Sequence, residues 1–280
     1  SNISVPVTAT RITATAQFRA RQVVTSGIYA GLGNPSTLPI RYAEIQILDA
    51  NGNIIQCGET GTAGQISVDI PQSAGTYTLK VLSRAQNSNH VIASILNNPT
   101  AMTPYSISTS FTIGSGQATQ AVTLASATYA DSLEGGAFNI LDQIVNANEY
   151  LLNNSTCSFC STFPGSVGIQ KVRVFWKPGL SPGAYYQSPT SATSFFISTD
   201  QASLGMAAGI YLLGGINDDI CVDTDHFDNS VIVHEYGHFL ENKYAYTDSP
   251  GGSHSGNSVI DPRLAWSEGW ANFVQSAVRN

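Results

Sequence analysis

Residues 43–81 read AEIQILDANGNIIQCGETGTAGQISVDIPQSAGTYTLKV, and apolar and polar side chains alternate through much of this stretch. A period of two places every second side chain on one face of a β-strand. Asn51-Gly52 follows the first apolar run and is typical of a hairpin turn. The same alternation occurs at residues 12–18 and 105–113. The segment 1–127 is therefore predicted to form an antiparallel β-sandwich. The residues expected on one face of each strand are Ile12, Ala14, Ala16, Phe18, Ala43, Ile45, Ile47, Ile66, Val68, Ile70, Tyr77, Leu79, Val81, Tyr105, Ile107, Phe111 and Ile113.

The stretch 43–81 also resembles the prealbumin-like accessory domains that are attached to secreted peptidases, including those called carboxypeptidase regulatory-like. The resemblance rests on the alternation and the turns over about forty residues. It implies a scaffold or targeting role for the β-domain and no catalysis. An immunoglobulin-like spacer domain is the other interpretation of the same pattern.

The pattern changes near residue 128. Residues 134–152, EGGAFNILDQIVNANEYLL, carry apolar side chains at helical spacing. Short apolar runs follow at KVRVFW (171–176) and GIYLLGG (209–215) and are predicted strands. The segment 128–280 is therefore predicted to be a second domain of the α+β class, which makes the chain multidomain.

Charge and composition exclude some kinds of partner. Only 11% of the 280 residues are charged, the net charge is −7 and the pI is about 5.0, so no basic surface for nucleic acid is expected. No apolar run reaches 18 residues, so no transmembrane segment is expected. The weakly charged, polar composition predicts a secreted or cell-surface protein, and the absence of Met before Ser1 is compatible with a removed leader. Nothing in the composition predicts the oligomeric state.

The four cysteines are Cys57, Cys157, Cys160 and Cys221. The close pair Cys157 and Cys160 lacks the second close pair of a zinc ribbon and the βαβ context of a thioredoxin-type site. For an exported chain, a disulfide is favoured over a metal or redox motif.

Residues 231–242, VIVHEYGHFLEN, contain two histidines four positions apart. On a helix His234 and His238 share one face, so both imidazoles can bind one metal ion. Glu235 lies beside them, where it can take a proton from a water molecule. Asp228, Asn229 or Ser230 can cap this helix. The alternative is an amphipathic helix with two partly exposed histidines.

A catalytic zinc site needs a third protein ligand and keeps one position open. The extension H-E-x-x-H-x-x-G-x-x-H is absent, because Tyr244 stands where it requires the last histidine. Residues 261–278, DPRLAWSEGWANFVQSAV, predict a second helix that starts at Asp261 and carries Glu268. Glu268 is the predicted third ligand, and His254 is the alternative.

HEYGH followed by SEGWANF resembles the gluzincin peptidases, and within them the fungalysin-like group. The resemblance covers about residues 228–275. It implies a zincin-type metallopeptidase domain with Zn²⁺ on His234, His238 and Glu268, Glu235 as general base, and a protein or peptide substrate. It also implies an edge strand that holds the extended substrate, for which GIYLLGG is the candidate.

Two features depart from that family. Asn272 stands where gluzincins have an Asp that orients a zinc histidine. The chain also ends at Asn280, twelve residues after Glu268, where gluzincins have further helices, so the peptidase domain is expected to be truncated at its C-terminus. A His or Tyr from those parts stabilises the developing oxyanion. Tyr244, Tyr246 and His254 are the candidates for that role in this chain.

An acidic stretch precedes the HEYGH segment, and its carboxylates could hold Ca²⁺, although their spacing does not fit an EF-hand loop. The other interpretations are solvated acids with a helix cap, or an Asp that orients a zinc histidine. The carboxylates are those of Asp218, Asp219, Asp223, Asp225 and Asp228.

A second functional class also fits the sequence. It is a surface adhesin or binding protein whose zinc site is vestigial or structural. In a structural site four protein ligands close the metal, with His254 as the fourth.

Overall fold

The computed structural model describes residues 8–24, 31–124, 133–154, 167–186, 193–216, 219–252, 254 and 259–279. Three α-helices lie in this part of the chain, α1 (Leu133–Asn154), α2 (Asn229–Tyr244) and α3 (Pro262–Arg279). Two short 3-10 helices also occur, η2 (Pro182–Tyr186) and η3 (Ala202–Leu204). Among the described helices, none is both long and apolar enough to cross a bilayer.

The largest sheet has eight strands in the order β14-β15-β13-β10-β9-β6-β7, with β11 also paired to β9. Its members are β6 (Ala43–Leu48), β7 (Ile54–Glu59), β9 (Gly75–Asn87), β10 (Val91–Leu96), β11 (Ser106–Ile113), β13 (Val172–Phe175), β14 (Phe195–Ile197) and β15 (Gly209–Tyr211). The predicted turn at Asn51-Gly52 joins β6 to β7, and Gly52 has the positive φ of 81° that such a turn requires.

Smaller sheets accompany the large one. A three-stranded sheet has the order β12-β1-β8, with β1 (Ala9–Thr15) antiparallel to β8 (Gln65–Pro71) and parallel to β12 (Thr119–Ala121). The remaining pairs are β2 (Gln17–Ala20) with β5 (Ser36–Pro39), β3 (Val23–Val24) with β4 (Gly31–Leu32), and β16 (Gly214–Ile216) with β17 (Asp219–Thr224).

The faces predicted from alternation are the inner faces of these strands. Most of those side chains are buried, and four are partly buried against the same core, Ala14, Val68, Tyr105 and Ile107. The strands β1, β6, β8 and β9, which belong to two different sheets, all contribute apolar side chains to that core. The β-rich architecture predicted for this segment is thus observed, with the parallel β1–β12 pair as a departure from an all-antiparallel arrangement.

The large sheet continues across the predicted domain boundary. The boundary at residues 127 and 128 lies outside the described residues, but β10 before it pairs in parallel with β13 after it, with Ala93 opposite Val172. Apolar residues from both sides of residue 128 also belong to one hydrophobic core. The two predicted segments therefore share a sheet and a core.

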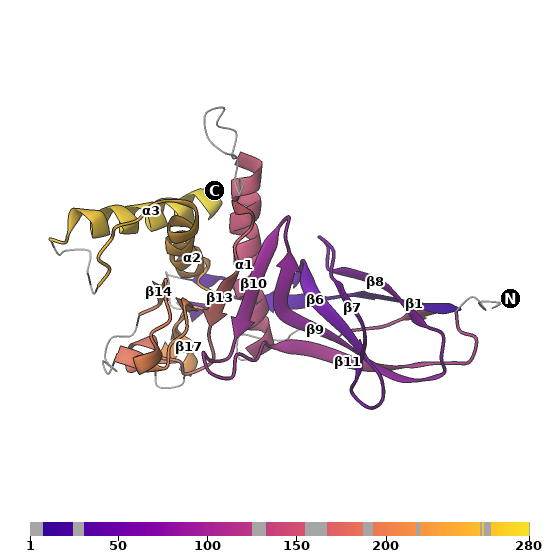
Figure 1. Cartoon of the computed structure of the whole chain (residues 1–280). Coiled ribbons are helices and arrows are strands. Elements are labelled where there is room, and N and C mark those ends of the chain that lie inside the picture. Colours follow the sequence, from indigo (N-terminus) through magenta and orange to yellow (C-terminus); the bar gives the residue numbers. More distant parts are fainter. Residues whose placement is uncertain are drawn as a thin grey trace.

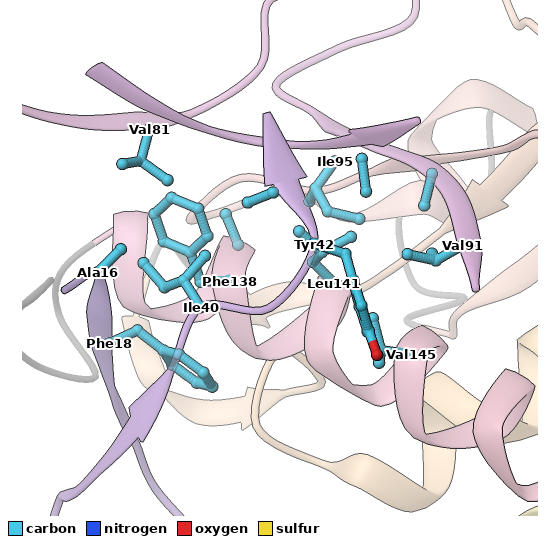
Figure 2. Close-up of a cluster of buried hydrophobic side chains, with 14 of the residues drawn as sticks. Ala16, Phe18, Ile40, Tyr42, Val81, Val91, Ile95, Phe138, Leu141 and Val145 are labelled. Atoms are coloured by element: carbon cyan, nitrogen blue, oxygen red, sulfur yellow. The ribbon is translucent and has the colours of Figure 1, made fainter. Parts of the chain in front are cut away.

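Helix α1 covers the middle of the large sheet. Phe138, Leu141 and Val145 point from α1 toward side chains of the strands and of the segment at Ile40, as Figure 2 shows. Their spacing of three and four residues gives α1 one apolar face, which explains why residues 134–152 fold as a helix. In Figure 1, α2 lies beside α1, and α3 crosses over α2 at the end of the molecule away from the N-terminus.

Polar contacts fix α1 and α2 in these positions. Arg41 donates hydrogen bonds of 2.8 Å to Asp142 and 2.7 Å to Glu149 on α1. The Tyr236 hydroxyl on α2 donates a 2.6 Å bond to Asn148 on α1. Burial favours such bonds because a buried polar group without a partner costs free energy. Helix α2, which carries the two histidines, is thus bonded to α1, and α1 packs against the large sheet.

Candidate metal centre

Helix α2 begins at a capped end. The Asp228 carboxylate accepts hydrogen bonds from the backbone N–H groups of Ser230, at 2.9 Å, and Val231, at 3.3 Å. This bonding satisfies donors that have no partner within the helix, and it assigns Asp228 as the cap. Buried apolar residues on α2 attach it to the core and leave His234, Glu235 and His238 on the side that faces α3 and a cavity. These apolar residues are Ile232, Val233, Tyr236, Phe239 and Leu240.

Asp261 directly precedes helix α3, and its carboxylate accepts a 2.9 Å bond from the Arg263 N–H, as predicted for a cap. Its buried stripe is Leu264, Ser267, Ala271 and Val274. At Gly237 the two helices come so close that an added Cβ would lie 3.0 Å from the Ala271 Cα. The Trp270 indole N–H also donates a 2.9 Å bond to the Gly237 carbonyl. Glycine at this position therefore lets α3 approach α2.

This approach brings the three predicted ligands together. The Nε2 atom of His234 lies 3.2 Å from Glu268 Oε2, and the Nε2 atom of His238 lies 3.5 Å from Glu268 Oε1. One potential ligand atom from each of the three residues lies within 4.8 Å of the other two. All three side chains are partly buried. His234, His238 and Glu268 thus form a group that could hold a metal ion.

The hydrogen-bond partners of the Nδ1 atoms of His234 and His238 determine whether their Nε2 atoms are free to bind a metal. The Ser267 hydroxyl donates its single hydrogen to Glu241, at 2.5 Å, so its oxygen accepts the 3.2 Å bond from His238 Nδ1. His234 Nδ1 lies 3.2 Å from the Asn272 side-chain oxygen, also an acceptor. With the Nδ1 hydrogen of each ring directed to these acceptors, Nε2 is the nitrogen of each imidazole that is left to bind a metal beside the Glu268 carboxylate. Three electron-pair donors that converge in this way fit a divalent cation.

The pKa shifts of Glu268 and His234 agree with a site in which these side chains could bind a cation. Burial raises the pKa of Glu268, but the hydrogen bonds to His234 and His238 and the histidine charges outweigh burial and hold the pKa well below its usual value. Burial lowers the pKa of His234, and this is outweighed by the Glu268 hydrogen bond and the charges of Glu235 and Glu268, so the pKa is raised. Without a metal these shifts favour a proton on His234 beside an ionised Glu268. A metal must displace that proton, which makes binding weaker at lower pH.

Glu235 lies beside the cluster and is 7% exposed. Burial raises the pKa of its carboxyl group, and the nearby His238 and His234 partly offset this rise. A carboxylate with a raised pKa is a better proton acceptor than a solvated one, which suits a general base. Glu235 lines the same cavity as the three possible ligands. The structure thus brings the predicted base to the predicted metal site.

The cavity has a volume of about 310 Å³. One of its walls comes from residues 193–198, which include β14, and another from His254 with Gly251 and Gly252. Strand β14 pairs with β15 on one side, and no strand among the described residues pairs with its other side. The predicted edge strand in GIYLLGG is therefore wrong, because Gly209–Tyr211 forms β15, which pairs with both β13 and β14. The edge strand beside the metal site is Phe195–Ile197.

The three oxyanion candidates lie in different places. His254 is at the cluster, with Nε2 3.3 Å from Glu268 Oε2. The Tyr244 hydroxyl donates to the Gly168 carbonyl at 3.1 Å and accepts from the Gln170 N–H at 2.8 Å. These bonds direct it away from the cavity, so the prediction that placed Tyr244 in the catalytic site is corrected. Tyr246 is 89% exposed and does not line the cavity.

The acidic stretch and the cysteines are only partly described. Asp228 serves as the helix cap, and the Asp225 carboxylate accepts a hydrogen bond from Ser194. Asp225 and His234 line one further small hollow, and the prediction that an Asp orients a zinc histidine stays a prediction. Cys57 is an exposed free cysteine. Asp218, Cys157 and Cys160, and the side chains of Asp219, Cys221 and Asp223, lie outside the described parts, so the Ca²⁺ and disulfide predictions stay predictions.

Two residues of the centre were not predicted from the sequence. Ser267 and the buried Glu241 form the chain of hydrogen bonds behind His238. The available signal was spacing, because Glu241 lies three residues after His238 on the same helix face and Ser267 directly precedes Glu268. Asn272, noted as a neutral substitute for an Asp, does contact His234.

No protein-family model matches the sequence, and no curated protein matches it either. Among solved structures, the chain is similar to the Bacillus anthracis TIE protein, with 16% sequence identity and a TM-score of 0.23. The match covers 43% of this chain and spans 17% of the length of that protein. Similarity at this level does not establish a shared fold or activity.

Proposed function

We propose that the chain is a zinc-dependent metallopeptidase that is exported and hydrolyses peptide bonds. The observation that carries the proposal is the convergence of the His234 and His238 Nε2 atoms on the Glu268 carboxylate, with Glu235 in the same cavity. Two imidazoles and one carboxylate are a ligand set typical of catalytic zinc, which leaves a position open for substrate. The zincin-type interpretation of residues 128–280 belongs to this proposal.

A bound zinc ion would polarise a water molecule and the scissile carbonyl. Glu235 takes the proton from the attacking water and passes it to the leaving amine, so no covalent intermediate forms. Its burial keeps bulk water away and raises the pKa of the carboxyl group, which favours both steps. His254 lies at the rim of the same cavity, and its Nδ1 hydrogen faces the Gly252 carbonyl, so it donates a hydrogen bond to the developing oxyanion from Nε2 in its doubly protonated form.

The edge of β14 that no described strand pairs with gives the substrate its orientation. An extended peptide can add to this edge as a further strand, held by backbone hydrogen bonds. Residues before and within β14 line the cavity that contains Glu235, so a peptide bound along the strand passes the possible metal ligands. This geometry favours extended peptides over compact substrates.

The experiment compares unmodified protein with His234→Ala, Glu268→Ala and Glu235→Gln. We expect about one zinc per chain in the unmodified protein and in Glu235→Gln, and loss of zinc in the two ligand variants. Hydrolysis of casein should occur only in the unmodified protein and stop with a chelator. Glu59→Gln, on the exposed surface of β7, is the control and should keep both zinc and activity. Activity retained in Glu235→Gln would contradict the mechanism.

One observation favours a second function, a binding or adhesin protein with a structural zinc site. His254 Nε2 is 3.3 Å from Glu268 Oε2, close enough to supply a fourth ligand. A structural site is closed by four protein ligands. X-ray absorption of the zinc-loaded protein distinguishes the two, because His254→Ala would remove one nitrogen ligand from a structural site and none from the proposed catalytic one.

A further inference from the structure

A second hollow lies along the same edge strand. It has a volume of about 230 Å³ and is lined by Phe196, Ile197 and Ser198 of the β14 segment and by Phe239 of α2. Phe196 and Ser198 also line the cavity of the metal centre. The two hollows thus meet at the same edge strand, and a peptide that follows this strand reaches both.

Three basic side chains surround the second hollow, Lys171, Arg173 and Lys243. Lys171 directly precedes β13, Arg173 is in β13, and Lys243 comes from the last turn of α2. The whole chain has only 12 Lys and Arg residues against 19 Asp and Glu residues. A quarter of its positive side chains therefore lies around one hollow of an acidic protein. Asp200 is the single acid there, and its carboxylate accepts a 2.7 Å bond from the Ala208 N–H.

These three cations have no anionic partner in the described part of the chain. Some other arginines do have one: Arg11 pairs with Asp69, Arg84 pairs with Glu44, and Arg41 pairs with two acids. Arg19 and Arg21 lie far from the hollow in sequence and also lack a partner among the described residues. Lys171, Arg173 and Lys243 form no hydrogen bond through their side chains and no ion pair with a described residue. Arg173 is also half-buried, and a guanidinium that is partly removed from water is stabilised by a carboxylate.

We propose that this hollow is a substrate subsite that binds a carboxylate of the peptide while the scissile bond lies at the metal centre. The inference rests on the proposed function, because it assigns the substrate class of that site. A carboxylate suits the hollow since guanidinium groups bind carboxylates through two parallel hydrogen bonds, and the two lysines add positive charge. The carboxylate comes from an Asp or Glu side chain or from the C-terminus of the peptide.

The test uses metal-loaded protein and two series of fluorogenic peptides. In the first series, Glu occupies each position on either side of the scissile bond in turn, and Gln replaces it in the matched peptide. In the second series, a peptide ends in a free carboxylate or in an amide. At one position we expect the charged peptide to have a kcat/KM about tenfold higher than its neutral partner, which is the size expected of a charge-assisted hydrogen bond. The series in which this occurs identifies the source of the carboxylate.

Three variants assign the preference to the hollow. Arg173→Gln and Lys243→Gln should reduce it to about twofold or less, while neutral peptides are cleaved as before. Lys177→Gln, an exposed lysine that does not line the hollow, is the matched control and should keep the full preference. Metal content and circular dichroism establish that each variant is folded. If Arg173→Gln does not fold, the result for Lys243→Gln alone tests whether the preference depends on the hollow.

The outcomes separate this inference from the proposed function. Hydrolysis without any preference for charged peptides overturns the subsite and leaves the peptidase proposal intact. A preference that survives in both Arg173→Gln and Lys243→Gln also overturns the subsite. If the metal-loaded protein cleaves neither the neutral nor the charged peptides, the proposed function fails, and the subsite fails with it.

Discussion

The Ser267 hydroxyl donates a 2.5 Å hydrogen bond to the buried carboxylate of Glu241. Because that bond uses the only hydrogen of the hydroxyl, the Ser267 oxygen accepts from His238 Nδ1 and leaves Nε2 for a metal. Partners of this kind fix the orientation of a metal-binding imidazole and raise its basicity. His234 has the neutral Asn272 in the same role. The negative charge behind the ligands thus lies on the His238 side.

Removal of this hydrogen-bond chain should weaken metal binding. We expect Ser267→Ala and Glu241→Gln each to lower zinc affinity about 10–100-fold, and the double variant to lose little more because both changes break one chain. Competition with a chromophoric chelator measures the affinity. Ser276→Ala, on the same helix and exposed, is the control. Additive losses in the double variant would show that the two residues act separately.

Gly237 and Gly269 should respond in opposite ways to replacement by alanine. At Gly237 the new Cβ would press against the Ala271 backbone at 3.0 Å, so we expect a loss of about 1–3 kcal/mol in unfolding free energy and weaker zinc binding as α3 moves away. At Gly269 nothing lies within 4 Å, so Gly269→Ala should stabilise the helix by about 0.5–1 kcal/mol. Urea unfolding measures both. Equal effects at the two positions would contradict the close approach of α2 and α3.

The Tyr236 hydroxyl should contribute to stability and not to catalysis. Tyr236→Phe leaves the buried Asn148 side chain without this donor, and we expect a cost of about 1–3 kcal/mol in unfolding free energy. Thermal unfolding of Tyr236→Phe and Tyr246→Phe provides the comparison, since Tyr246 is exposed and its change should have little effect. A similar melting temperature for both variants would show that the α1–α2 contact does not hold in solution.

His254 and Tyr244 differ in their expected effect on turnover. If His254 stabilises the oxyanion, His254→Ala should lower kcat about 10²–10³-fold with zinc still bound. Tyr244→Phe should leave kcat within about twofold, because its hydroxyl bonds to the segment at Gly168 and Gln170. Steady-state measurement of kcat with one peptide substrate shows which of the two side chains contributes to turnover. A larger loss in Tyr244→Phe would reverse the assignment.

The Glu44–Arg84 pair should make part of the stability depend on pH. Burial raises the pKa of Glu44, but the hydrogen bond and charge of Arg84 outweigh it, so the pKa in the folded protein is lowered. The pair therefore stabilises the protein above the unfolded-state pKa of about 4.3, and the effect is lost as pH falls through the lower folded pKa. The difference in unfolding free energy between unmodified protein and Arg84→Met should be about 1 kcal/mol or less at pH 7 and shrink toward pH 3.

Urea unfolding at several pH values tests this dependence. Arg11→Gln breaks the exposed pair with Asp69 and serves as the comparison, with little effect at any pH. A constant difference between unmodified protein and Arg84→Met from pH 7 to pH 3 would show that the Glu44 carboxylate does not contribute through its charge.

Local spacing predicted the parts of this structure that depend on local geometry. Alternation placed Ile45 and Ile47 on a buried face, and the four-residue spacing placed His234 and His238 on one helix face. The third member of the cluster, Glu268, followed from a second helix whose cap was visible in the sequence. Each of these features is set by periods of two or 3.6 residues, which a sequence displays directly.

Features that depend on distant pairing were not predicted. The parallel pairing of β10 with β13 joins residues far apart in the chain, and alternation does not specify such a partner. The edge strand was assigned to GIYLLGG because periodicity cannot distinguish an edge strand from an interior strand. The short strand β14, with three residues, had no periodic signal. Ser267 could not be assigned a role until its distance from His238 was known.

The β10–β13 pairing has a consequence for how the chain can be divided. A fragment that begins near residue 128 would lose β10 and leave the backbone of β13 unpaired along one side. Exposed strand edges of this kind promote aggregation, so such a fragment is expected to be insoluble even though it contains every proposed metal ligand. The N-terminal strands are thus a structural requirement of the metal centre and cannot be exchanged as an independent module.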